Sequence, residues 1–251
     1  MADQKPVIEK IKLNPFKLLV QSWQRYRKDF VRLWLTAVVA SVPASILRLT
    51  GQSGTVDLSY IGSMAGIFML IALLLVVLER ETNARQSLVA LYNQASGSFL
   101  RYLGLSIIEA VIAVPLIVSF VLLVLALGVQ FSFWPAIVVA AAVGLGFFAY
   151  IFTRFSLSPY FLLDSNITVW RSLRSSWRMT KKRFWKILGG YVVILLIVIT
   201  ISSGTVQLLN MVPLFRQNDF VNAIISGLLA SLLLPFLLVY VGKIYDRVAA
   251  R

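Results

Sequence analysis

Acidic and basic side chains are the main candidates for chemistry in this chain, because the sequence contains neither cysteine nor histidine. Thiolate nucleophiles, thiol or imidazole zinc sites and Ser/His/Asp triads are therefore excluded. The ten Asp and Glu residues are scattered along the chain, whereas a carboxylate metal site needs several of them close together. We therefore predict that the protein is not an enzyme, has no catalytic residue and needs no cofactor or metal.

One carboxylate, Glu109, lies inside a long apolar stretch. It follows Arg101 by eight residues, so it would lie ~12 Å along a helix that enters a membrane near that arginine. A carboxylate at that depth is costly, which makes it a functional-site hypothesis by default. Arg154, expected near the cytoplasmic end of the next span, would have to lean inward to pair with it. Two interpretations stay open: a structural side chain that is protonated or snorkels inward, and a proton-coupled or substrate-contacting site.

A basic segment before residue 187 is the second candidate site. Helical spacing places Trp177 on an apolar side of this segment and most of the basic residues on the other side. Such a helix lies in the membrane interface, with Trp at the depth of the headgroups and basic side chains reaching the phosphates. We expect a contact surface for anionic lipid or a membrane-embedded partner, made of Trp177, Arg178, Lys181, Lys182 and Arg183. The alternative is that the helix only orients the span that follows it.

The composition is that of a membrane protein, with 59% hydrophobic and 14% charged residues. Six stretches approach the ~20 apolar residues that cross ~30 Å of hydrocarbon. They cover roughly 30–48, 60–79, 103–127, 134–155, 187–209 and 220–242. Little of the chain is left outside them. We therefore expect residues 1–251 to form a single membrane domain, an all-α integral membrane protein with six transmembrane helices.

A short pattern occurs three times in the chain. An aromatic residue is followed seven residues later by Phe, an apolar residue, a basic residue and two apolar or aromatic residues, beginning at Trp23, Tyr92 and Trp177. Before the first copy, Asn14 and Pro15 form a good helix start. A repeat of this length is a supersecondary unit that cannot bury its faces alone. We expect three units of interfacial amphipathic helix plus helical hairpin, at about 13–79, 84–155 and 166–243.

The positive charge is unevenly distributed. When the six spans are threaded across a membrane, all 24 Lys and Arg residues except Arg48 and Arg216 fall on one side. The positive-inside rule then places both termini in the cytoplasm. The formal net charge of +14 is thereby directed at anionic headgroups, so we predict membrane lipid and not nucleic acid as the partner. The middle interfacial helix carries almost no charge and should pack on protein.

Residues 154–190 carry an unusual motif. Its positions are Arg154, Pro159, Asp164, Leu173, Ser176, Trp177, Thr180, Phe184, Trp185, Leu188 and Gly189. The motif resembles that of the membrane domain in some glycerophosphoryl diester phosphodiesterases and in related bacterial six-span membrane proteins of unknown function. One departure is Ser172, where the family tends to have a small apolar residue. The resemblance implies a multi-pass protein of the bacterial plasma or inner membrane. It does not extend to the phosphodiesterase catalytic barrel, which depends on histidines that this chain lacks.

Two functions are compatible with these patterns. The first is a non-enzymatic membrane component that engages anionic lipid or a membrane-embedded partner through its basic interfacial helices. The alternative is a small transporter or permease, in which Glu109 and helices kinked by Pro43, Pro115 and Pro235 form a path. Three units of the same topology are typical of a scaffold rather than a transporter, whereas a scaffold has no need for an intramembrane carboxylate.

Small residues mark the places where helices should approach closely. Gly62 and Gly66 form a GxxxG pattern in the second predicted span, and Gly144 and Gly146 follow a run of alanines in the fourth. Small side chains of this kind allow two helix backbones to pack together. We expect these contacts to lie within one chain rather than between two copies.

Overall fold

The computed structural model describes residues 14–39, 59–79, 87–131, 134–181, 183–210 and 219–249. Within these ranges the chain forms helices and turns without any β-strand, so the predicted all-α fold class is confirmed. The helices are α1 (Pro15–Lys28), α3 (Ser59–Leu78), α4 (Leu88–Phe131), α5 (Trp134–Phe155), α6 (Ser158–Asp164), α7 (Val169–Lys181), α8 (Phe184–Asn210) and α10 (Asp219–Ala249). A helical segment, Phe30–Val39, follows α1.

Helices occupy the predicted spans wherever the structure describes them. α3 and α5 agree with the second and fourth predicted spans to within a residue, while residues 40–48 of the first span lie outside the described residues. In the described part, two stretches are long and apolar enough to cross a membrane, Leu88–Val114 and Phe184–Thr205. Phe30–Val39 and Gly66–Leu78 are apolar but shorter. The structure therefore offers two candidate membrane-crossing helices.

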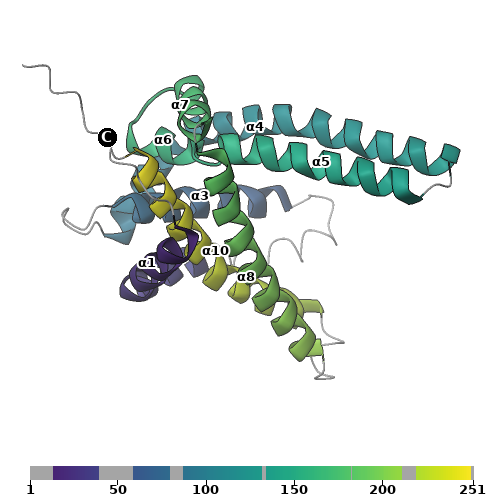
Figure 1. The fold of residues 1–251 in the computed structure, drawn as a ribbon. Coiled ribbons are helices and arrows are strands. Elements are labelled where there is room, and N and C mark those ends of the chain that lie inside the picture. Colours follow the sequence, from purple (N-terminus) through teal and green to yellow (C-terminus); the bar gives the residue numbers. More distant parts are fainter. Residues whose placement is uncertain are drawn as a thin grey trace, which may run out of the picture.

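The helices meet at one end of the molecule and diverge from it (Figure 1). α4 and α5 lie side by side as one long arm, while α8 and α10 leave the common end in a different direction. The core lies where the helices meet. Every residue of α3 from 71 to 77 is buried, and so is most of α10 from Phe236 onward. An apolar helix of this kind is covered on all sides because it has no polar face to give to water.

The start of α1 follows the sequence prediction. The side-chain oxygen of Asn14 accepts hydrogen bonds from the backbone N–H groups of Phe16 and Lys17, at 3.1 and 3.4 Å. Pro15 occupies the first helical position, where its missing N–H is not needed. The cap therefore supplies acceptors for two N–H groups that have no partner inside the helix.

The interfacial helix predicted before the third span is not a separate element. α4 is continuous over its whole length, so the helix does not break before the third predicted span. In the other two copies the helix ends at a basic run, with α1 ending at Lys28 and α7 at Lys181. Basic side chains stabilise a helix C-terminus. The second copy lacks such a run, and Phe99 stacks on Phe68 of α3 with the ring centroids 4.3 Å apart.

The aromatic residues of the three repeated patterns pack on helices from other parts of the chain. Trp23 of α1 contacts Phe236 of α10 edge to face, with the ring centroids 5.8 Å apart. Trp177 of α7 contacts Tyr150 of α5 in the same way, at 5.9 Å. In the middle copy, Phe99 packs on Phe68 of α3. The three patterns therefore contact three different helices, α10 for the first copy, α3 for the second and α5 for the third.

An ion pair joins the helical segment Phe30–Val39 to the end of α3. The guanidinium group of Arg32 binds both carboxylate oxygens of Glu79, with Nη2 3.0 Å from Oε1. The two side chains are only 17% and 15% exposed. Arg25 of α1 donates to the backbone carbonyls of Val77 and Glu79, at 2.6 and 2.8 Å. α1 and the segment after it are thus both fastened to the C-terminal end of α3.

Close helix contacts occur at two glycines outside the predicted patterns, while the side of Gly62 lies outside the described residues. A Cβ atom placed on Gly66 or Gly146 would have no neighbour within 4 Å among the described residues. On Gly190 it would lie 2.8 Å from the hydroxyl oxygen of Tyr240, and on Gly242 it would overlap Val77. The tight contacts therefore join α10 to α8 and to α3.

Candidate functional site

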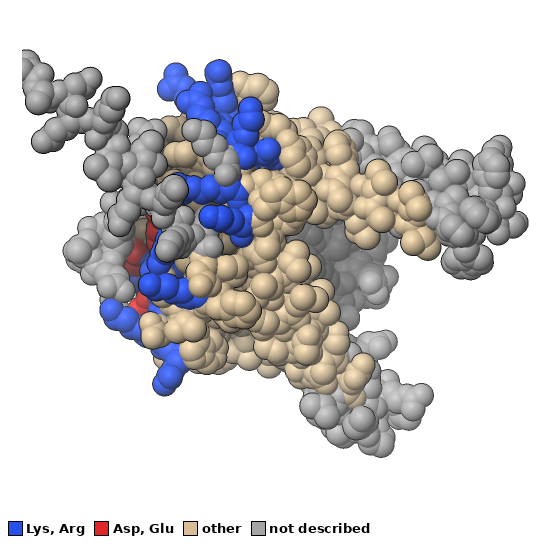
Figure 2. Space-filling view, viewed as in Figure 1, with Lys and Arg blue, Asp and Glu red and all other residues tan. Residues whose placement is uncertain are grey.

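α7 separates buried small residues from exposed basic ones. Its inner face is formed by Ser172, Leu173, Ser176 and Thr180, all of which are buried. Its outer face carries four exposed cations, Arg171, Arg174, Arg178 and Lys181, which we call the α7 basic face. Figure 2 shows that Lys and Arg gather at the end of the molecule where the helices meet, while the described parts of the diverging arms lack them on the side in view.

The five residues predicted as a contact surface do not all lie on this face. Arg178 and Lys181 are exposed there, and Trp177 is partly exposed beside them. Arg183 turns toward α10, where its Nη1 donates to the backbone carbonyl of Arg247 at 3.3 Å. Lys182 lies outside the described residues. The structure therefore groups two of the predicted cations with Arg171 and Arg174 from earlier turns of the same helix.

Arg154 lies beneath α7 in a cage of aromatic rings. Its guanidinium carbon is 4.8 Å from the ring centroid of Tyr150, 5.1 Å from that of Trp177 and 5.5 Å from that of Phe184. The side chain is 6% exposed. A cation over the face of an aromatic ring is attracted by the ring quadrupole, and the attraction grows when water is excluded. The cage therefore holds a buried positive charge directly behind Trp177.

The hydrogen bonds of Arg154 are incomplete in the described part of the chain. Nη2 lies 3.2 Å from the hydroxyl oxygen of Tyr150, but Nε and Nη1 are buried without an acceptor there. The backbone carbonyl of Arg154 accepts a bond of 2.6 Å from Ser176 of α7. The backbone and the rings thus fix the position of the guanidinium group without neutralising its charge.

The turn between α6 and α7 is held from two sides. Asn166 adopts a left-handed backbone conformation with φ 47, and its side-chain oxygen accepts a hydrogen bond from Arg101 of α4. Tyr245 of α10 donates to Asp164 at the end of α6, at 2.7 Å. Burial raises the pKa of Tyr245 and the neighbouring Asp164 raises it further, so the phenol stays protonated and keeps donating. These contacts set the direction in which α7 leaves the core.

Glu109 and Arg154, the two predicted intramembrane polar residues, are not brought together. Glu109 accepts a hydrogen bond of 2.5 Å from Ser158 of α6, and Ser158 also lies within bonding distance of the carbonyl of Phe155. The ion pairs of the described residues do not include one between Glu109 and Arg154. Nor do these residues include a group of three or more Asp and Glu that could hold a metal ion. Glu109 therefore links α4 to α6.

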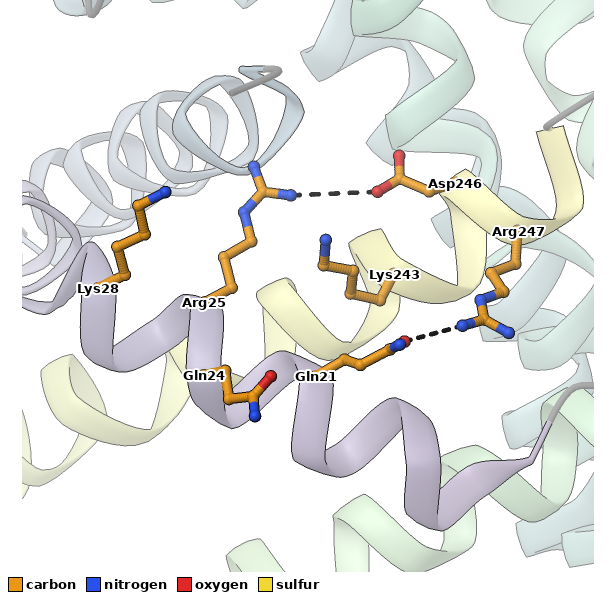
Figure 3. Close-up of a pocket in the computed structure, with 7 residues that line it drawn as sticks. All are labelled: Gln21, Gln24, Arg25, Lys28, Lys243, Asp246 and Arg247. Atoms are coloured by element: carbon orange, nitrogen blue, oxygen red, sulfur yellow. Dashed lines mark hydrogen bonds and ion pairs between the residues drawn. The ribbon is translucent and has the colours of Figure 1, made fainter. Parts of the chain in front are cut away.

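A polar pocket lies between α1 and α10, at the end of the molecule where the basic residues gather (Figure 3). Its lining residues are Gln21, Gln24, Arg25, Lys28, Lys243, Asp246 and Arg247. The sequence does not indicate that these residues meet, because the two halves of the pocket lie more than 200 positions apart along the chain. The cage around Arg154 was more accessible to prediction, since Tyr150 and Arg154 are four residues apart and therefore face the same side of a helix.

Comparisons with known proteins add no relative. No protein-family model matches the sequence, and neither a curated protein nor a solved structure matches it.

Proposed function

We propose that the chain is a six-span integral membrane protein, with both termini in the cytoplasm, that engages anionic lipid through the α7 basic face. In this proposal it has no catalytic activity of its own. It belongs with the bacterial membrane proteins whose membrane domain the motif at residues 154–190 resembles. Its six spans and interfacial helices form three repeated units in one membrane domain.

Exposed apolar side chains on the long arms support a membrane location. α4, α5 and α8 expose many large apolar residues, among them Val111, Val114, Val138, Val143, Leu145, Leu195, Leu196 and Ile199. A contiguous apolar surface of this extent is unusual on a soluble monomer and is typical of surfaces that contact lipid or a partner. The cations lie at the opposite end from these arms, as expected for a positive cytoplasmic side (Figure 2).

The observation that carries the lipid proposal is the composite surface at α7. Four exposed cations line the helix, and Trp177 lies at their edge with the caged charge of Arg154 behind it. Tryptophan and basic side chains together are typical of helices that lie at the level of the lipid headgroups. Each cation near an anionic bilayer surface contributes roughly 1 kcal/mol of attraction. Three of them should therefore change lipid affinity measurably.

We expect the triple variant Arg174→Gln, Arg178→Gln and Lys181→Gln to lose phosphatidylglycerol. Removing three surface cations should lower affinity by about 2–3 kcal/mol, or ~30- to 150-fold. Native mass spectrometry of the protein, released from mixed micelles of phosphatidylglycerol and phosphatidylcholine, would measure the bound fraction of each lipid. The phosphatidylcholine signal should not change, because its headgroup is neutral overall.

A charge-matched control decides whether the position of the cations matters. The variant Lys17→Gln, Arg27→Gln and Lys186→Gln removes three exposed cations outside the α7 basic face. It should retain most of the phosphatidylglycerol that the wild type binds. Equal losses in the two triple variants would mean that net charge alone attracts the lipid, and the α7 proposal would have to be abandoned.

The transporter is the second candidate, and the contact of Glu109 with Ser158 gives it a separate test. Glu109→Gln keeps an oxygen that can accept this hydrogen bond, whereas Glu109→Leu removes it. We expect Glu109→Gln to leave the melting temperature in detergent nearly unchanged and Glu109→Leu to cost about 1 kcal/mol, since one hydrogen bond is lost. A small ligand that co-purifies with the wild type but not with Glu109→Gln would instead favour a transporter.

A further inference from the structure

The pocket between α1 and α10 is a second concentration of positive charge, separate from the α7 basic face. Its lining contains four basic residues and one carboxylate, that of Asp246. The pocket has a volume of about 440 Å³, which lies in the range of ligand sites, about 300–1,000 Å³. An excess of cations in a cleft of this size attracts anions and concentrates them there.

Arg25 is held in place by two backbone carbonyls and by a long ion pair with Asp246. Its Nη2 donates to the carbonyls of Val77 and Glu79 at the end of α3, which are backbone dipoles rather than full charges. Its Nη1 faces Asp246 at 4.0 Å, a distance longer than a direct hydrogen bond. Figure 3 shows the guanidinium group directed across the gap toward α10. One cation of the pocket is therefore positioned before any ligand arrives.

The α10 side of the pocket supplies a second positioned cation and one that has no partner among the described residues. Arg247 donates through Nη2 to the side-chain oxygen of Gln21 at 2.9 Å. The ammonium group of Lys243 lies between Arg25 and Gln21 in Figure 3, and no interaction is recorded for it within the described ranges. A lysine carries three donors. An anion seated between α1 and α10 would give them an acceptor.

We propose that this pocket binds a phosphate monoester. The excess of cations favours a doubly charged anion over a carboxylate, and guanidinium and ammonium groups both bind phosphate oxygens well. The volume exceeds that of a bare phosphate ion, so the body of the ligand has room beside Gln21 and Gln24, whose amides can bond to hydroxyl groups. The phosphate could be carried by a free phosphorylated small molecule or by a lipid headgroup such as that of phosphatidic acid.

The test is calorimetric titration of the detergent-solubilised full chain with inorganic phosphate and, separately, with dihexanoyl phosphatidic acid. Lys243→Gln should weaken the binding of the probe that fits by about tenfold, because one charge-assisted hydrogen bond is lost. Lys186→Gln, which removes an exposed lysine outside the pocket, should leave it unchanged. Tighter binding of phosphatidic acid than of phosphate would identify a headgroup as the source, and comparable binding would identify a free phosphate.

Two results would overturn the proposal. One is that neither probe binds the wild type. The other is that Lys243→Gln and Lys186→Gln bind with the same affinity. The α7 triple variant separates this site from the lipid surface, since it should keep its phosphate affinity while losing phosphatidylglycerol. Loss of phosphate binding in that variant, with none in Lys243→Gln, would assign the anion to α7 instead.

Discussion

Replacing Glu79 with glutamine is expected to destabilise the protein by about 3 kcal/mol, because it removes the carboxylate charge that faces the largely buried Arg32. In the wild type the guanidinium group bonds to both carboxylate oxygens. The substitution keeps the size of the side chain, so the change reports the charge rather than the packing. Unfolding in a titration with a denaturing detergent, followed by circular dichroism, would measure the free energy.

The double variant Arg32→Met and Glu79→Leu is the control for this prediction. Breaking a buried ion pair is expensive because one charge is stranded, whereas replacing both partners with apolar groups of similar size strands none. The double variant should therefore lose less stability than the sum of the losses in Arg32→Met and Glu79→Leu. If the changes in unfolding free energy of the two single variants simply add, the side chains do not interact. The ion pair would then not stabilise the contact between the segment Phe30–Val39 and α3.

The substitution Glu79→Gln should leave the proposed phosphate pocket intact. Arg25 is anchored on the backbone of Val77 and Glu79 and not on the carboxylate of Glu79. Glu79→Gln should therefore lower stability without moving Arg25 from the pocket. The ion pair of Arg32 and Glu79 is therefore distinct from the residues that would bind an anion.

Local features of the fold could be predicted from the sequence because short-range physics decides them. The cap at Asn14 depends on two neighbouring N–H groups, and the amphipathic character of α7 depends on spacing along one helix. The positions of the helices also follow from the apolar runs. The continuous course of α4 was not predicted, and within it Phe99 stacks on Phe68 of another helix, a contact that no local pattern indicates.

The candidate sites were predictable to different degrees for the same reason. Arg178 and Lys181 were predicted as surface cations and are exposed, whereas Arg183 turns to a carbonyl of α10 that no local pattern indicates. Arg154 was expected near the cytoplasmic end of its span, from where it would have had to lean inward to pair with Glu109. It is surrounded by aromatic rings instead, two of which come from helices later in the chain. The periodicity of residue types along the sequence does not indicate tertiary contacts of this kind.

The glycine contacts also could not be predicted from local sequence patterns. The GxxxG pattern that includes Gly66 has the spacing of a helix contact, yet Gly66 has open space beside it in the described part of the structure. Gly242 belongs to no such pattern. It lies where α10 meets Val77 of α3 and Tyr160 of α6. Whether a glycine is needed depends on the facing side chain, which the motif does not contain.

Gly242→Ala should therefore destabilise the protein by about 1–3 kcal/mol, even though alanine is the better helix former. The new methyl group would overlap Cγ1 of Val77, a β-branched side chain that has little freedom to rotate away, and would lie 3.5 Å from Cε1 of Tyr160. The thermal midpoint in detergent should fall. Gly189→Ala is the matched control in α8, because no described residue lies within 4 Å of the added atom. This substitution should be neutral or stabilising by up to about 1 kcal/mol.

The partner substitution Val77→Ala identifies the cause. Alone it should destabilise, because it leaves a small cavity in the core. Combined with Gly242→Ala it should restore part of the lost stability, since it removes the atom that the new methyl group overlaps. Such a favourable coupling would show that the close approach of α10 to α3 requires glycine at this position. Purely additive losses would indicate that α10 can move aside, and that the contact does not fix its distance from α3.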